Sequence, residues 1–168
     1  GAPPWDVFHQ GVSKQTEISV GKVIVMTGFI LLLLWIPLKQ KPGLGTILNA
    51  LEIGLVADLA LAIIPEPNNI FIRVVMAALG IVIVAVGTGF YIGSALGPGP
   101  RDGLMTGLAK RGIPIRIGRT AIEVTVLIVG LVLGGQVGVA TFAFAFGVGP
   151  LVHFFLPRLA ISSGNAQP

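Results

Sequence analysis

Long apolar runs, interrupted only by short polar connections, constrain this chain more than any other feature. They cover about residues 19–38, 46–64, 70–96, 117–133 and 137–156. Crossing about 30 Å of hydrocarbon takes about 20 apolar residues in a helix, and the backbone within lipid must form helices or a closed barrel. The runs lack the alternation of barrel strands. We therefore expect an all-α, polytopic membrane helix bundle with about five spans, surrounded by a lipid bilayer.

The composition agrees with a single transmembrane domain over residues 1–168. Hydrophobic residues make up 54% of the chain and charged residues 11%, whereas soluble domains are about 25% charged. The lack of cysteine excludes disulfides, thiolate catalysis and cysteine-based metal sites. The net charge of +4 comes from residues that flank the apolar runs and form no basic stripe, so we expect no nucleic-acid partner.

The distribution of lysine and arginine predicts the orientation of the chain. The segments after the first, third and fifth runs contain eight of these residues: Lys39, Lys41, Arg101, Lys110, Arg111, Arg116, Arg119 and Arg158. The other segments contain three, namely Lys14, Lys22 and Arg73. Because cytoplasmic segments are enriched in basic residues, we expect the C-terminus in the cytoplasm and Gly1 outside.

The start of the chain matches its middle. Residues 1–14 align without a gap on residues 97–110, and five pairs are identical: Gly1/Gly97, Pro4/Pro100, Asp6/Asp102, Gly11/Gly107 and Lys14/Lys110. With a one-residue shift, Gly21 and Lys22 then fall on Gly118 and Arg119. Further along, Thr46, Ala50 and Gly54 fall on Thr141, Ala145 and Gly149. The common order of these matches predicts a duplication.

The duplication predicts repeat 1 at about residues 1–66 and repeat 2 at about residues 70–158. Repeat 2 begins with the apolar run 70–96, for which repeat 1 has no counterpart. We therefore expect a first helix to be missing from repeat 1 and six spans in the full protein. Three spans in each copy would invert the second copy relative to the first, as in many secondary transporters.

Five stretches also carry a family resemblance that covers nearly the whole chain: residues 4–11, 41–50, 91–105, 122–123 and 147–150. The most distinctive is Gly-Pro-Gly-Pro-Arg-Asp-Gly at residues 97–103. On these residues the chain resembles the YczE/YyaS/YitT-like integral membrane proteins of bacteria. The resemblance implies about six spans and a bacterial plasma membrane, and it brings no reaction or substrate.

Two short segments have the pattern of a helix start, with proline at the first position and an acid in the first turn: Pro4-Trp5-Asp6 and Pro100-Arg101-Asp102. Neither helix is long enough to span a bilayer. One interpretation is a pair of half-helices that enter from opposite sides and line a transport path. The alternative is two ordinary helices that lie in the membrane interface.

Ionisable residues within apolar runs are the second functional signal, because each costs about 2.5 to 3.5 kcal/mol at a helix centre. Estimated depth predicts a cytoplasmic substrate or ion site from Arg101, Asp102, Glu52, Glu123, Arg119 and His153. The counterparts in the first copy are Trp5, Asp6 and Asp58. Two alternatives remain open, since Arg119 and Glu123 can form a local ion pair and His153 can lie at the interface.

The leading hypothesis is a small transporter or channel-like protein with a cytoplasm-facing charged site for an anionic small molecule or a proton. The rival is an accessory or regulatory membrane subunit, within a homo-oligomer or a larger membrane complex. No nucleophile and base occur in a recognisable motif, so we do not expect an enzyme. We also expect no cofactor and no metal site.

Overall fold

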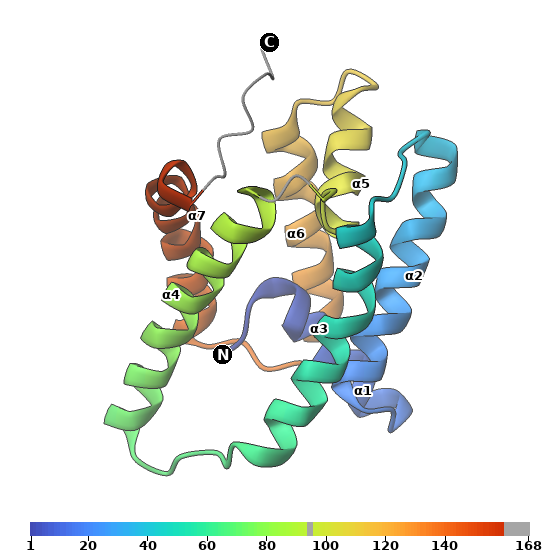
Figure 1. The fold of residues 1–168 in the computed structure, drawn as a ribbon. Helices are drawn as coiled ribbons and strands as arrows, with labels where there is room; N and C mark the ends of the chain where they lie inside the picture. Colours follow the sequence, from blue (N-terminus) through green and yellow to red (C-terminus); the bar gives the residue numbers. More distant parts are fainter. Residues whose placement is uncertain (94–95, 160–168) are drawn as a thin grey trace.

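A computed structural model describes residues 1–93 and 96–159; of these, the side chains at 89, 92, 93, 115, 116, 149, 152, 153 and 156–159 are not described. The described part of the chain is helical (Figure 1). Its helices are α1 (Pro4–Thr16), α2 (Val20–Leu38), α3 (Leu44–Ile63), α4 (Ile70–Gly93), α5 (Pro100–Ala109), α6 (Ile115–Val132) and α7 (Val139–Leu159).

The five long helices coincide with the five apolar runs, in agreement with the expected all-helical membrane bundle. Among the described residues, three segments are long and apolar enough to cross a membrane: Val20–Leu38, Leu44–Ile63 and Ile70–Thr88. Large apolar side chains on these helices, such as Leu55 and Ile83, are 68% exposed. Such outward apolar faces are suited to contact with lipid. The count of five spans stays a prediction.

Apart from α2 and α3, the main packed pairs join helices that are distant in the sequence. α4 packs along α7 and α2 along α3, while the short helix α1 packs on α6 and the short helix α5 packs on α2 (Figure 1). α2 and α6 run in opposite directions in this view. Each short helix thus lies against a long helix from the other half of the chain.

The C-terminal ends of α2 and α6 have the same backbone structure. Gln40 N–H donates to Trp35 O at 3.1 Å, and Gly135 N–H donates to Gly130 O at 2.8 Å. The residue before each donor has positive φ, 52° at Lys39 and 91° at Gly134. This hydrogen bond beyond a left-handed residue is the Schellman helix ending. The two endings are 95 positions apart, the same separation as Thr46 and Thr141.

Small residues allow the short helices to approach α2 and α6 closely. A Cβ atom on Gly103 of α5 would lie 1.8 Å from Cζ2 of Trp35, whose side chain is 2% exposed on α2. A Cβ atom on Gly130 of α6 would lie 2.6 Å from the backbone nitrogen of Phe8 on α1. Both crossings therefore leave no room for a side chain at the glycine.

Candidate functional site

The N-terminal ends of the two short helices meet inside the bundle. Trp5 and Arg101 are the second residues of α1 and α5, and each follows a proline at the helix start. The guanidinium carbon of Arg101 lies 4.8 Å from the centroid of the Trp5 ring. An arginine over the face of a tryptophan is attracted by the ring quadrupole. The two matched segments are thus joined by a cation–π contact.

Charged side chains from α1, α5 and α6 gather around this contact, and we call Asp6, Arg101, Asp102, Arg119 and Glu123 the central cluster. Arg101 is attracted by the carboxylates of Asp6, Asp102 and Glu123. Arg119 Nε donates to Glu123 Oε1 at 3.0 Å. Asp6 and Asp102 lie in the first turns of their helices, where the partial positive charge of the helix end stabilises a carboxylate.

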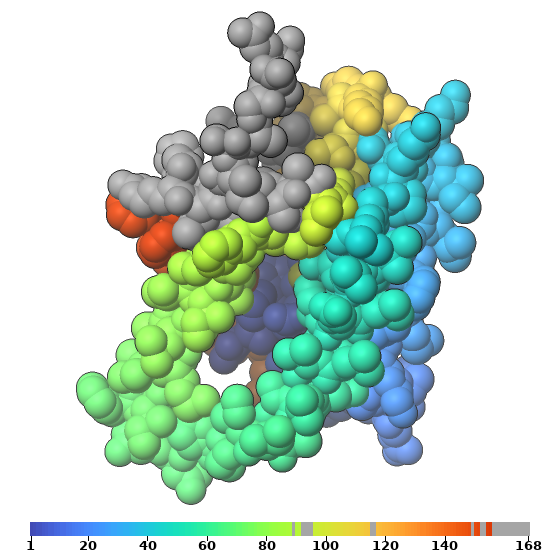
Figure 2. All heavy atoms as spheres, viewed as in Figure 1, coloured from blue at the N-terminus to red at the C-terminus, as the bar shows by residue number. Residues whose placement is uncertain are grey.

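The central cluster includes a partly exposed carboxylate. Asp102 keeps more than a third of its surface accessible, yet protein surrounds it closely enough that burial raises the pKa of its carboxyl group, against the pull of Arg119 and Arg101. Figure 2 shows an opening between α3 and α4, with α1 visible at its back.

His9, on the next turn of α1, is the site residue that the sequence did not reveal. Its side chain is 0% exposed, and its Nδ1 lies 3.4 Å from Asp6 Oδ1. The rings of Trp5 and Phe8 lie beside the imidazole, with centroids 6.3 and 5.7 Å away. Nε2 is buried without a hydrogen-bond partner among the described residues. The only sequence signal was the spacing of three between Asp6 and His9, which puts them on one helix face.

The other predicted site residues lie elsewhere. Glu52 is exposed on α3, where it borders a shallow hollow of about 370 Å³ with Ile53 and Val56. Asp58 accepts hydrogen bonds from Ser19 Oγ at 2.6 Å and Gly21 N–H at 2.7 Å, so it caps the start of α2. The side chain of His153 lies outside the described residues.

Six of the nine predicted residues therefore meet: Trp5, Asp6, Arg101, Asp102, Arg119 and Glu123. The local Arg119–Glu123 ion pair, given above as an alternative, forms as part of the central cluster. Among the described residues, no three His, Asp or Glu side chains are grouped as metal ligands.

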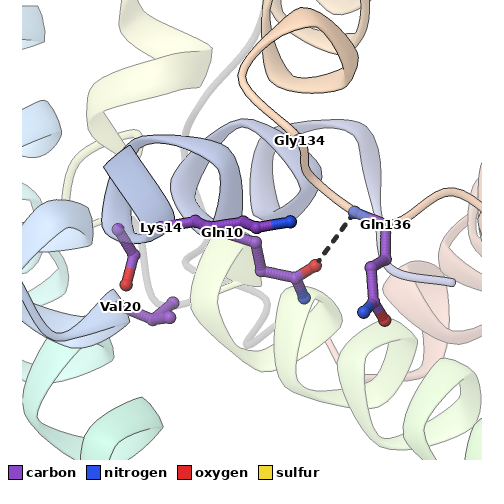
Figure 3. A pocket seen from close by; sticks show the side chains of 6 residues that line it. Gln10, Lys14, Val20, Gly134 and Gln136 are labelled. Carbon is purple, nitrogen blue, oxygen red and sulfur yellow. Dashed lines mark hydrogen bonds between the residues drawn. The ribbon is translucent and has the colours of Figure 1, made fainter. Parts of the chain in front are cut away.

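A second hollow, of about 330 Å³, lies at the C-terminal part of α1 (Figure 3). It is lined by Gln10, Ser13, Lys14, Val20, Gly134 and Gln136. Gln136 N–H donates to Gln10 Oε1 at 3.4 Å, and the Lys14 side chain extends toward Gly134 in Figure 3. The corresponding crossing of α5 and α2 contains a hydrogen bond from Lys110 Nζ to Gln40 Oε1 at 3.3 Å. Amide and lysine side chains thus line the ends of both crossings.

Two buried threonines hold the loops that lead into the short helices. Gly43 N–H donates to Thr46 Oγ1 at 3.1 Å, and Gly138 N–H donates to Thr141 Oγ1 at 3.2 Å. A Cβ atom on Gly97 would lie 2.9 Å from Thr46 Oγ1, and one on Gly1 would lie 2.7 Å from Thr141 Oγ1. Aligned positions therefore make corresponding contacts, each with the loop before the short helix of the other half of the chain.

The C-terminal ends of the two short helices also form hydrogen bonds with the other half of the chain. Gln15 Nε2 donates to Leu133 O at 3.0 Å, at the end of α6. Arg111 donates from its guanidinium group to Pro37 O, near the end of α2. Gln15 and Arg111 occupy aligned positions, 96 residues apart. Each side chain satisfies a carbonyl group that the helix end leaves without an intrahelical partner.

Comparisons with known proteins find a family match and several relatives of the chain. A family described as "Family of unknown function (DUF6198)" matches residues 1–157. The chain is 38% identical over 161 residues to an uncharacterized protein of Haemophilus influenzae, covering 95% of this chain and 74% of that protein. It is 29% identical over 160 residues to the uncharacterized membrane protein YczE of Bacillus subtilis, covering 94% and 74%. It is 27% identical over 164 residues to the uncharacterized protein YyaS of the same organism, covering 94% and 81%. No solved structure matches the chain.

Proposed function

The chain belongs to the family of unknown function DUF6198, with YczE and YyaS among its relatives, and from the geometry of the central cluster we propose that it is a small membrane transporter for an anionic solute. The proposal rests on one observation: the N-terminal ends of α1 and α5 are in contact through Trp5 and Arg101, and carboxylates surround this contact. The family description assigns no activity, so the proposal rests on the site.

The lengths of the short helices support a position near the middle of the bilayer. At about 1.5 Å per residue, α1 is about 20 Å long and α5 about 15 Å, compared with about 30 Å for the hydrocarbon core. Each short helix is therefore too short to cross the hydrocarbon core. If its C-terminal end lies at one membrane surface, its N-terminal end lies near the midplane. An arginine there is costly unless it has charged partners within the protein, and Asp6, Asp102 and Glu123 attract Arg101 at the central cluster.

We propose that residues 1–66 and 70–158 are inverted repeats. Support comes from the crosswise packing of α1 on α6 and α5 on α2, and from the opposite directions of α2 and α6. The matched hydrogen bonds of Thr46 and Thr141 add support at the level of single atoms. Inverted repeats with helix N-termini at their interface are a known way to build a transport site at the midplane.

Charge supports an anionic solute. Both helix N-termini carry partial positive charge and unpaired N–H groups, and Arg101 adds a full charge between them. In the empty protein, Asp6 and Asp102 compensate this charge. An anion that displaces a carboxylate from Arg101 gains a charge-assisted hydrogen bond. We further propose that the end with Lys110 and Arg111 faces the cytoplasm, because basic residues concentrate there.

Uptake into reconstituted vesicles tests the proposal. A panel of phosphate, sulfate, acetate and amino-acid anions is offered to the wild type and to Arg101→Ala. We expect uptake of at least one anion and its loss in Arg101→Ala. Arg73→Ala is the matched control, because Arg73, in the first turn of α4, pairs with the exposed Glu66 at 3.1 Å, and it should transport normally. No uptake of any anion by the wild type would refute the proposed function.

An accessory subunit is the second candidate, and Glu52 is the observation that favours it. Its side chain is exposed on α3, beside apolar residues and a shallow hollow. A charge in such a position needs a partner, and a basic or hydrogen-bond-donating membrane helix would supply one. Cross-linking from a single cysteine at Ala57 in native membranes tests this, since the chain has no other cysteine. A specific adduct that Glu52→Leu removes would support the subunit function.

A further inference from the structure

His9 and Asp6 lie together on α1, and no role in the proposed function uses His9. The imidazole is completely enclosed, with Nδ1 directed to Asp6 at 3.4 Å and Nε2 unpartnered among the described residues. Asp6 in turn is 38% exposed, so it connects the enclosed ring with the accessible space. An enclosed ring nitrogen without a partner, next to an accessible carboxylate, has the properties of a proton-binding site.

We propose that Asp6 and His9 form the proton-binding pair that couples anion uptake to a proton, an inference that rests on the proposed function of Arg101. In the neutral ring, Nε2 carries the hydrogen and the lone pair of Nδ1 faces Asp6. The coupling proton enters through the accessible carboxyl group of Asp6 and binds at Nδ1. The resulting imidazolium is stabilised by the carboxylate of Asp6 through Nδ1.

Competition for Asp6 provides the coupling. Asp6 attracts Arg101, and Arg101 disfavours a positive charge on His9. An anion bound to Arg101 cancels this repulsion and frees Asp6 for the imidazolium. The anion therefore strengthens proton binding at His9, and by linkage the proton strengthens anion binding by the same factor. Both ligands enter the site together, and one negative and one positive charge are added.

Charges on the surrounding helices also act on Arg101. Among the described residues, the groups that act on His9 are Asp6 on α1 and Arg101 on α5. Asp102 on α5 and Glu123 on α6 also attract Arg101, Arg119 on α6 acts on Asp102, and α2 carries Lys22, which acts on Asp58. Burial lowers the pKa of His9, and Arg101 lowers it further. Both effects disfavour the imidazolium in the empty protein, and a bound anion removes the effect of Arg101.

Nuclear magnetic resonance titration tests the pair directly. His153→Gln leaves His9 as the single histidine, and the protein is labelled with ¹⁵N-histidine in detergent micelles. In Arg101→Gln we expect the proton affinity of His9 to rise about tenfold, about one pH unit. In Asp6→Asn we expect it to fall by a similar factor. Lys22→Gln is the matched control and should leave the titration unchanged.

The titration outcomes decide whether the pair exists. Opposite shifts in Arg101→Gln and Asp6→Asn support the competition. A His9 titration unaffected by both variants overturns the proposal. If either variant fails to fold, phosphate, sulfate or acetate added to the His153→Gln protein gives a second test, because at least one of these anions should raise the His9 proton affinity. No change with any of them would count against the pair.

Vesicle experiments separate this proposal from the proposed function. With a pH-sensitive dye inside, uptake of the anion identified in the panel should carry protons in the wild type. Asp6→Asn and His9→Gln should reduce that proton uptake at least tenfold. If both variants transport the anion with normal proton uptake, the coupling is wrong and the transporter proposal stands. If the wild type transports no anion, the transporter proposal and the coupling fail, and the titration still reports on the pair.

Discussion

The two crossings of a short and a long helix have the same backbone arrangement, but different side chains fill the contact. Where α5 crosses α2, the Trp35 ring fills the contact against Gly103 and donates Nε1–H to Pro100 O at 3.0 Å. Where α1 crosses α6, the position aligned with Trp35 is Gly130, and the backbone of α1 itself comes into contact. Close approach is the shared requirement, and either a ring against a glycine or a backbone against a glycine meets it.

The two crossings also differ in chemistry. The start of α5 supplies Arg101 and Asp102, whereas the start of α1 supplies Trp5, Asp6 and the enclosed His9. Aligned positions thus support different functions, because the shared backbone contacts do not require the same side chains. A charged group and the aromatic ring that holds it come from different halves of the chain.

The largest expected effects come from the two glycines. Gly103→Ala and Gly130→Ala should each lower the free energy of unfolding by about 3 kcal/mol, at the upper end for overpacking, measured in mixed detergent micelles. The crossings should differ in rescue. Trp35→Leu should relieve Gly103→Ala, with a favourable coupling of about 1 to 3 kcal/mol. Val7→Ala should not relieve Gly130→Ala, because a Cβ atom there meets backbone atoms. Rescue of both variants would remove the distinction.

The buried threonines should show a smaller difference. Thr46 Oγ1 accepts from Gly43 N–H and donates to Pro98 O at 2.7 Å, whereas Thr141 Oγ1 accepts from Gly138 N–H. We expect Thr46→Val to cost about 2 kcal/mol and Thr141→Val about half as much, because each variant removes a hydroxyl group that buried groups use as a hydrogen-bond partner, without a change of shape. The same unfolding assay measures both. Equal costs would contradict the assigned hydrogen bonds.

Asp102, at the start of α5, should make the stability of the protein depend on pH. Burial raises the pKa of Asp102 above its usual 3.8, so a proton is bound more tightly in the folded protein than in the unfolded chain. Asp102 therefore favours folding most at low pH, and this contribution is lost as the pH rises through the folded-state value. The stability of Asp102→Asn relative to wild type should increase over that window. A difference that is independent of pH would contradict this, and Glu66→Gln in an exposed connection is the control.

The smallest effects are expected at the helix ends. Gln15→Ala and Arg111→Ala each remove one exposed hydrogen bond to a carbonyl group of the other half. We expect losses of about 0.5 to 1 kcal/mol, with the arginine variant at the upper value because its donor is charged. Thermal unfolding, monitored by size-exclusion chromatography, measures these losses of stability. A larger loss for Gln15→Ala would show that the α1 crossing depends more on its end contacts.

Several elements of the site could be predicted because they depend on local chemistry. Proline followed by an acid marked the starts of α1 and α5, and the ordered self-match paired Thr46 with Thr141. The exposed position of Glu52 and the enclosure of His9 could not be predicted in this way. Helical periodicity assigns a residue to a face, and it does not say which other helix covers that face.

The membrane class, the long helices and the two short ones follow from the residues along the chain, because lipid requires about 20 apolar residues per span and proline with an acid favours a helix start. Which residues form the central cluster depends on how the helices pack. Asp6 and Arg101 are 95 positions apart, and they interact only because α1 crosses α6 while α5 crosses α2. Such contacts depend on the summed packing of whole helix faces, for which no single stretch of sequence carries the information.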